Sequence, residues 1–172
     1  MRLWLIRHAK SSWSSAAGGD FDRPLNQRGE RDGPKMRDWL ADQAHPAQWI
    51  WTSDAARAAA TAAFVAEAFP DAALKADHRL YGASPTTLVG VLRETPAAIA
   101  TAAIVAHNPS ITHCVNLLVA STVIDNMPTF GAVLLWWPGG PEALQAGAAR
   151  LEALMSPKRL LGDLPPGHIP LD

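Results

Sequence analysis

Two histidines of the sequence stand where a buried strand is expected to end. Arg7-His8 directly follows a short apolar run, and His107-Asn108 directly follows another. An unpaired arginine is rarely buried, so packing alone does not explain a strand that ends in Arg-His. An imidazole can act as a nucleophile or exchange a proton, and a guanidinium group can hold two oxygens of an anion. These residue types are therefore candidates for chemistry on a phosphoryl group.

A third junction of the same kind carries a second arginine. Residues 49–52 read as a buried strand that runs into Thr52-Ser53, and Arg57 follows in the expected first turn of a helix. The carboxyl ends of parallel strands form a crevice in α/β sheets, and the helix N-termini there present free N–H groups that suit phosphate. We therefore expect the two arginines and the two histidines to converge on one crevice.

Each of these residues also has a purely structural explanation. An arginine in an alanine-rich helix, such as Arg57, commonly faces solvent. A histidine after a buried strand, such as His107, can bond its own turn. The agreement of three junctions favours a shared site over three separate coincidences.

Apolar runs of strand length alternate with helical patterns along the chain. Strands are expected at 3–6, 49–52, 102–106, 132–137 and 149–155, and helices at 25–43, 54–69, 85–93 and 109–119. Asn26, Ser84 and Asn108 are the expected N-caps, and Pro34 predicts a kink or a restart in the first helix. The alternation predicts one domain over residues 1–172 with an α/β fold. This fold is a three-layer sandwich with a mostly parallel central sheet and helices on both faces.

Composition excludes several classes of protein. The formal net charge is −1 without a basic stripe, which argues against a nucleic-acid partner. The apolar N-terminus is too short to cross a membrane, which predicts a cytoplasmic protein without a membrane partner. The single cysteine, Cys114, lies in an apolar run and is expected to be a buried, inert thiol. No Cys/His cluster has zinc spacing, and there is no P-loop and no Gly-x-Ser-x-Gly motif.

The ordered set of motifs resembles the histidine phosphatase superfamily, in the branch related to phosphoglycerate mutases. The motifs are Arg-His-Ala at 7–9, Arg-Pro-Leu at 23–25, Arg57 with Thr61, His-Asn-Pro at 107–109, and Met-Pro-Thr-Phe at 127–130. The resemblance runs from residue 3 to about residue 157. Within the superfamily, the chain is most similar to the SixA-type phosphohistidine phosphatases.

This resemblance implies a phosphoglycerate mutase-like fold and a role for each matching residue. It implies that His8 is the nucleophile, and that Arg7, Arg57 and His107 hold the phosphoryl group, with His107 adding positive charge if it is protonated. Ser11 and Ser14 stand near positions that help hold phosphate in relatives, and Asn108 accompanies His107 as a further substrate-binding residue. Neither a metal nor a cofactor is implied. The implied partner is a phosphorylated substrate, such as a protein that bears phosphohistidine.

Two departures from the family pattern bear on the chemistry. Ala9 stands where the family usually has glycine. The carboxylate that many relatives use as a general acid has no clear counterpart, and Asp20 and Asp22 are possible substitutes. An alkoxide leaving group needs a proton in the transition state, whereas the imidazole of phosphohistidine takes up its proton easily. A site without a placed acid therefore favours phosphohistidine.

Two alternatives stay open at the level of the sequence. The chain could be a small-molecule phosphomonoesterase on the same scaffold. It could also be a low-turnover module that binds phosphate. Retention of both histidines and both arginines argues against a mere binding module, because binding alone does not need a nucleophile.

Overall fold

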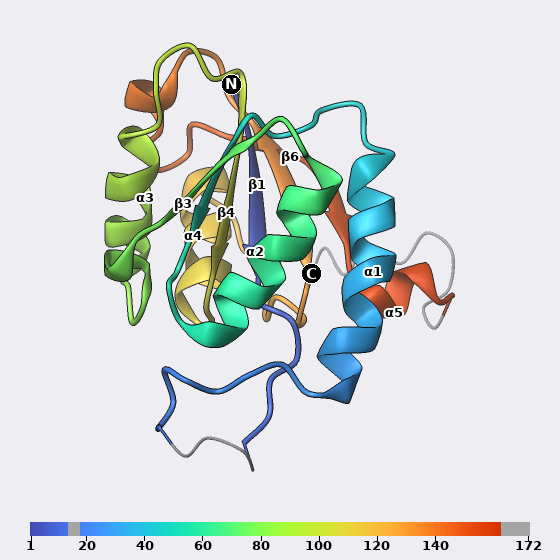
Figure 1. Cartoon of the computed structure of the whole chain (residues 1–172). Helices are drawn as coiled ribbons and strands as arrows, with labels where there is room; N and C mark the ends of the chain where they lie inside the picture. Colours follow the sequence, from blue (N-terminus) through green and yellow to red (C-terminus); the bar gives the residue numbers. More distant parts are fainter. Residues whose placement is uncertain (14–17, 163–172) are drawn as a thin grey trace.

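The computed structural model describes residues 1–13 and 18–162 of the chain (Figure 1). Its strands are β1 (Arg2–Arg7), β2 (Trp49–Thr52), β3 (Ala73–Ala76), β4 (Thr101–Ala106), β5 (Ala132–Trp136) and β6 (Arg150–Met155). Its helices are α1 (Gln27–Ala41), α2 (Ala56–Ala68), α3 (Pro85–Arg93), α4 (Ser110–Val119) and α5 (Pro157–Leu160). Two 3₁₀ turns, η1 (His78–Leu80) and η2 (Pro141–Ala143), complete the order.

The strands form one mixed sheet in the order β3-β2-β4-β1-β5-β6. The first four strands of this order run parallel to one another. β5 is antiparallel to β1, and β6 is antiparallel to β5. The predicted α/β fold with a mostly parallel sheet is confirmed, and the antiparallel part is confined to the last two strands.

Helices cover both faces of the sheet because the buried strands are apolar on both sides. In β1, Leu3 and Leu5 belong to one core cluster, together with residues of α3 and α4. Trp4 and Ile6 belong to a second cluster, together with residues of α1 and α2. Successive side chains of a strand point to opposite faces, so these clusters fill the two sides of the sheet. Figure 1 shows α3 and α4 on one side of β1 and α1 on the other.

Two of the three predicted N-caps are confirmed. The Asn26 side chain accepts a hydrogen bond from Gly29 N at 3.0 Å, and Ser84 Oγ accepts one from Thr87 N at 3.1 Å. The prediction for Asn108 is wrong, because α4 begins at Ser110 and Asn108 makes no cap. Its side chain instead donates to the carbonyl of Met127, which is distant in the sequence, and accepts from Thr112 in α4.

The predicted restart at Pro34 is also wrong, since α1 is one uninterrupted helix through this residue. A proline removes one helical hydrogen bond, so another interaction must favour the helix. Close packing against α2 provides it: a Cβ on Gly33 would lie only 2.3 Å from the Phe64 ring. Gly33 therefore allows the two helices to approach closely enough to offset the lost bond.

The sequence pattern does not predict two of the elements, β3 and α5. Every residue of β3 is exposed, so this short edge strand lacks an apolar period. α5 has only 4 residues. Cys114, by contrast, is fully buried as predicted, and burial raises the pKa of its thiol to about 12.

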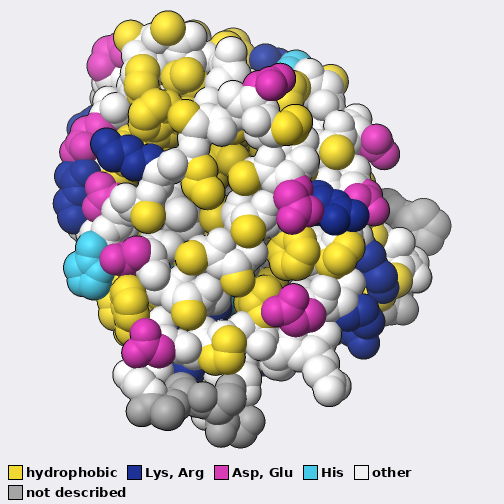
Figure 2. All heavy atoms as spheres, in the orientation of Figure 1, with side chains coloured by type: hydrophobic (Ala, Val, Ile, Leu, Met, Phe, Trp, Pro, Cys, Tyr) yellow, Lys and Arg dark blue, Asp and Glu magenta, His cyan; other side chains and the backbone are white. Residues whose placement is uncertain are grey.

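Surface properties agree with the near-neutral composition on the face that Figure 2 displays. Basic and acidic side chains are interspersed there, and apolar atoms are scattered between them. Within residues 1–13 and 18–162, no helix combines the length and the apolar character that crossing a bilayer requires.

A pair of glycine substitutions tests the packing that anchors the loop after β1. A Cβ on Gly29 would lie 2.2 Å from the backbone oxygen of Lys10, so Gly29→Ala should lower the free energy of unfolding by about 1–3 kcal/mol. Gly90 lies in α3 with open space around it, so Gly90→Ala should raise that free energy by about 0.5–1 kcal/mol. Urea unfolding measures both, and equal effects of the two substitutions would contradict the contact.

Candidate active site

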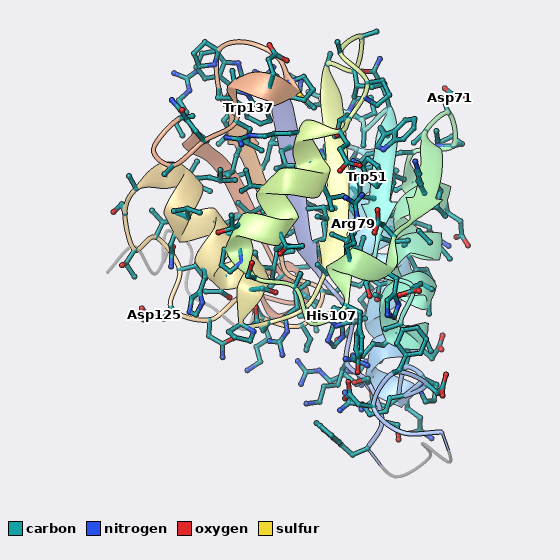
Figure 3. All side chains as sticks on the ribbon, turned by 90° about the vertical axis from the view of Figure 1, so that its left-hand side faces the viewer. Trp51, Asp71, Arg79, His107, Asp125 and Trp137 are labelled. Atoms are coloured by element: carbon teal, nitrogen blue, oxygen red, sulfur yellow. The ribbon has the colours of Figure 1, made fainter. Side chains whose placement is uncertain are left out.

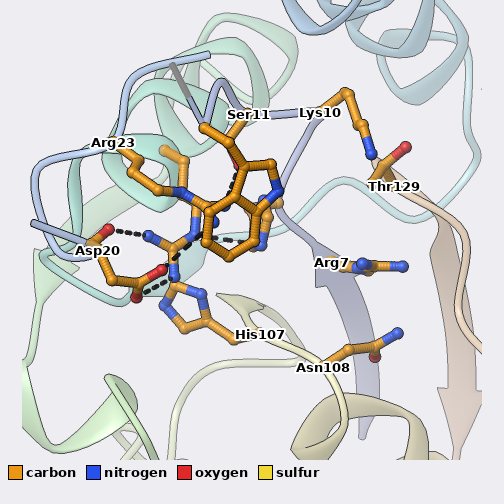
Figure 4. Close-up of a pocket in the computed structure, with 11 residues that line it drawn as sticks. Arg7, Lys10, Ser11, Asp20, Arg23, His107, Asn108 and Thr129 are labelled. Atoms are coloured by element: carbon orange, nitrogen blue, oxygen red, sulfur yellow. Dashed lines mark hydrogen bonds and ion pairs between the residues drawn. The ribbon is translucent and has the colours of Figure 1, made fainter. Parts of the chain in front are cut away.

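Polar residues after three adjacent strands meet at one edge of the sheet. β2, β4 and β1 are parallel neighbours, so their carboxyl ends lie together. His107, which follows β4, lies at one end of the sheet in Figure 3, and Trp137 lies at the opposite end. A cavity of about 310 Å³ at this edge is lined by Arg7, His8, Lys10, Ser11, Trp13, Asp20, Arg23, Arg57, His107, Asn108 and Thr129 (Figure 4).

Most of the site residues that the sequence predicts line this cavity. Arg7, His8, Arg57 and His107 all line this cavity, as do Ser11 and Asn108. Ser14 lies outside the described residues. The cavity also contains residues that had no assigned role in the sequence: Lys10, Trp13, Arg23 and Thr129.

His8 is buried, and one of its ring nitrogens has a fixed role. Nδ1 lies 2.7 Å from the carbonyl oxygen of Ala9. A carbonyl can only accept a hydrogen bond, so Nδ1 carries the proton of the neutral ring. Nε2 is then left with a free lone pair, toward which Arg57 Nε donates at 3.3 Å.

The backbone around His8 is held from several directions. His8 N donates to Ala106 O at 3.1 Å, and Phe130 N donates to His8 O at 3.1 Å. Ala9 N donates to Thr61 Oγ1 at 2.9 Å, and this hydroxyl donates to Arg57 O at 2.7 Å. Thr61 therefore couples the position of the His8 loop to that of Arg57.

Ala9, the departure from the family's glycine, fits without strain. Its side chain is fully buried. Among the described residues other than glycine, only Ala120 and Phe130 have a positive φ. Ala9 therefore has a backbone conformation that any residue adopts, and the methyl group needs no special geometry.

Two buried arginines share one carboxylate. Arg57 donates from Nη1 to Asp20 O at 2.6 Å and from Nη2 to Asp20 Oδ2 at 3.1 Å. Arg23 Nη1 lies 3.3 Å from Asp20 Oδ1, and Arg23 Nη2 donates to Ser11 Oγ. Figure 4 shows Asp20 and Arg23 on one side of the cavity and Arg7, Lys10 and Thr129 on the other.

Asp20 is poorly suited to donate a proton in the free protein. Tyr81 donates a hydrogen bond to Asp20 Oδ2 at 2.8 Å. This bond, followed by the charge and hydrogen bonds of Arg57, holds the pKa of the Asp20 carboxyl below its ordinary value. An ionised Asp20 accepts hydrogen bonds only. It balances the positive charge of Arg57 and Arg23.

The other carboxylates near these elements lie outside the cavity. Asp22 is exposed and does not line the cavity. Asp77 and Glu94 are both paired with Arg79, at 2.7 Å each. Asp20 is therefore the carboxylate that lines the cavity among the residues described.

His107 faces His8 across the cavity. Their ring centroids are 5.1 Å apart at an interplanar angle of 55°. His107 Nε2 lies 2.8 Å from Ser53 Oγ, while Nδ1 is buried and has no hydrogen-bond partner among residues 1–13 and 18–162. The Tyr81 ring lies edge-on to His107, 5.7 Å between centroids.

Arg7 is oriented by the chain before β5. Its Nη1 donates to Met127 O at 2.6 Å, and Asn108 Nδ2 donates to the same oxygen at 3.1 Å. Arg7 Nε is buried and has no partner among the described residues. The guanidinium group therefore retains donor capacity for a ligand.

Both imidazoles are neutral at pH 7. Burial, together with the nearby charges of His107, Arg57 and Arg7, lowers the pKa of His8 to about 3. Burial and then the charge of Arg57 lower the pKa of His107 to about 4. Protonation of His107 is therefore disfavoured in the free protein, because burial beside arginines disfavours a further cation.

The described residues contain no group of three or more His, Cys, Asp or Glu side chains with the geometry to hold a metal ion. The charges that surround the cavity come instead from fixed guanidinium groups, with Lys10 in addition. The prediction that the reaction needs no metal stays a prediction.

Comparison with known proteins gives close agreement over most of the chain. An uncharacterized protein of Mycobacterium tuberculosis is 28% identical over 162 residues, which is 89% of this chain and 100% of that protein. The structure of a putative phosphohistidine phosphatase SixA from Nakamurella multipartitia has a TM-score of 0.80 and 24% identity, covering 91% of this chain and 95% of that one.

A structure of the protein histidine phosphatase SixA complexed with tungstate has a TM-score of 0.80 and 20% identity, over 93% of this chain and 99% of that one. At these identities, the two structures establish the shared fold. Residues 3–108 match the model of the histidine phosphatase superfamily, branch 1. This match extends over more than half of the sequence and includes both histidine junctions, and the chain therefore belongs to the histidine phosphatase superfamily.

Proposed function

We propose that this protein is a metal-independent phosphatase that forms a covalent phosphohistidine intermediate on His8. One observation carries the proposal: a neutral His8 with an unprotonated Nε2 lies in a cavity lined by Arg7, Arg23 and Arg57. A nucleophile with a free lone pair and three fixed cations are the groups that phosphoryl transfer needs.

In the first step, His8 Nε2 forms a bond to phosphorus while the bond to the leaving group breaks. The electron pair of that bond goes to the leaving group. The proton on Nδ1 stays in place, held by the Ala9 carbonyl. Water then attacks phosphorus and the bond to Nε2 breaks, with its electron pair returning to Nε2. Inorganic phosphate is released, and His8 is again neutral.

The guanidinium groups stabilise the charge that spreads over the phosphoryl oxygens in the transition state. In the free protein, Asp20 holds donors of Arg57 and Arg23. A bound phosphoryl group competes with Asp20 for these donors. Its negative charge also favours protonation of His107, which would then add a further donor.

The proposed substrate is phosphohistidine, carried on a protein as in a SixA-like phosphatase. The reason is that no carboxylic acid among the described residues is placed to protonate the leaving group: Asp20, the carboxylate that lines the cavity, is held ionised by Tyr81 and Arg57. An imidazole leaves without strong assistance from an acid, whereas an alkoxide does not. Likeness to the structures of SixA phosphatases supports the same substrate class.

Replacing the nucleophile tests the mechanism directly. His8→Ala should abolish phosphate release from phosphohistidine, because it removes the nitrogen that forms the intermediate. Wild type should retain full activity with a chelator present. His113→Ala is the matched control, since His113 is an exposed histidine on α4, and it should behave as wild type.

Rapid mixing supplies a second measurement for the same prediction. An acid-labile phosphoenzyme should be trapped with wild type and be absent with His8→Ala. Activity that depends on added divalent metal would contradict metal independence. Binding of phosphate without any phosphoenzyme would point to a binding module instead.

A comparison of leaving groups tests the substrate class. Wild type should cleave phosphohistidine at least about 10²-fold faster than glycerol phosphate, because general acid catalysis of that order is missing for the alkoxide. The measurement is kcat/KM for both compounds at pH 7. Faster cleavage of glycerol phosphate would identify a phosphomonoesterase.

The neutral imidazoles predict how stability depends on pH. In the unfolded chain, His8 and His107 return to a pKa near 6.5, so below this pH the unfolded state binds more protons than the folded state. The free energy of unfolding should therefore fall between pH 7 and pH 5, by about 2 kcal/mol for each of these histidines. Urea unfolding should show a loss about 2 kcal/mol smaller in His8→Asn.

The exposed His113 again supplies the control for this measurement. His113→Asn should lose as much stability between pH 7 and pH 5 as wild type does. An equal loss in His8→Asn and wild type would mean that the His8 ring is not buried in its neutral form.

A further inference from the structure

Trp13 is an exposed aromatic side chain in the candidate active site. It is 76% exposed, the most exposed of the large hydrophobic side chains in the described part of the chain. Single exposed apolar residues are common on protein surfaces and need no functional explanation. Trp13, however, lines the same cavity as His8, so its exposure bears on the function of the site.

One face of the indole ring rests on an anchored residue of the site. The guanidinium carbon of Arg23 lies 3.5 Å from the centroid of the Trp13 ring. Arg23 is itself buried and is held by Ser11 Oγ and Asp20 Oδ1. A cation over the face of tryptophan is attractive, so Arg23 orients the ring. The high exposure of Trp13 leaves its other face open.

The exposure of His8 and Trp13 shows which of the two lies deeper in the cavity. His8 is 8% exposed and Trp13 is 76% exposed. A phosphoryl group that reaches His8 Nε2 therefore enters the deep part, and Trp13 lies nearer the mouth. The leaving group departs in line, on the side of phosphorus opposite the nucleophile. It therefore lies toward the mouth, within the region that Trp13 borders.

We propose that the open face of Trp13 is a leaving-group subsite that stacks a planar heteroaromatic ring. The inference rests on the proposed function and deepens it, since the ring would be the imidazole of phosphohistidine. Two flat rings in offset or edge contact attract each other beyond their buried area. An aliphatic P–N compound, such as phospholysine, lacks this ring and gains only ordinary contact.

The test compares two P–N substrates on variants of Trp13, with kcat/KM measured for free phosphohistidine and free phospholysine. Trp13→Leu keeps an apolar cover over Arg23 but removes the π face, and Trp13→Phe keeps the π face. Trp13→Leu should lower kcat/KM for phosphohistidine by roughly 2- to 10-fold, the range expected for one aromatic pair, and leave phospholysine nearly unchanged. Trp13→Phe should retain the wild-type ratio.

Other outcomes overturn the subsite. An unchanged ratio in Trp13→Leu means that no ring stacks there, and an equal loss on both substrates means that Trp13 merely supports Arg23. Thermal unfolding of each variant shows whether the fold is kept, which is expected for so exposed a residue. A wild type that cleaves neither compound and forms no phosphoenzyme on His8 refutes the proposed function and the subsite together. An active wild type with an unchanged ratio refutes the subsite alone.

Discussion

A hydrogen bond of 2.7 Å joins Nδ1 of His8 to the carbonyl oxygen of Ala9, and the chemistry of the site depends on it. A neutral imidazole has one proton, and this bond assigns it to the nitrogen that faces away from the reaction. The N–H of the same residue, Ala9, donates to Thr61, whose hydroxyl bonds the backbone of Arg57. The orientation of the nucleophile and the position of the main cation beside it are thus set by one short network.

The same arrangement also has an electrostatic cost. Buried guanidinium groups need a partner, and two neutral imidazoles lie close to them. Asp20 provides that partner for Arg57 and Arg23, and it comes from a loop rather than from the sheet. The carboxylate therefore stabilises the cations in the free protein and competes with a phosphoryl group for the same donors. The more tightly Asp20 binds these donors, the more binding free energy a substrate must supply to replace it.

The sequence predicts the framework of the site better than its lining. Apolar runs mark the strands, and parallel strands necessarily bring their ends together, so the convergence of Arg7, His8, Arg57 and His107 follows from pattern and topology. Asp20 and Trp13 lie on the segment between β1 and α1, where no periodicity determines the backbone. Their contacts with Arg23 depend on tertiary folding, and only the Arg-Pro-Leu motif hinted that Arg23 matters.

The two failed helix predictions have the same cause. An asparagine before a proline is a good N-cap in isolation, yet the Asn108 side chain donates to Met127 O from another part of the fold. A proline inside a helix is unfavourable in isolation, yet the contact of Gly33 with Phe64 offsets it. In both places a long-range contact outweighs a local preference, and a single sequence does not reveal such contacts.

The mixed character of the sheet explains how the remaining wall of the site is built. β5 runs antiparallel to β1, so β5 begins at the edge where the parallel strands end. The segment just before β5 is thereby delivered to the active site. Met127 O accepts from Arg7, and Phe130 N donates to His8 O, with Phe130 in the left-handed region at φ 53°. A fully parallel sheet would place that segment at the opposite end, near Trp137, and leave Arg7 without its carbonyl partner.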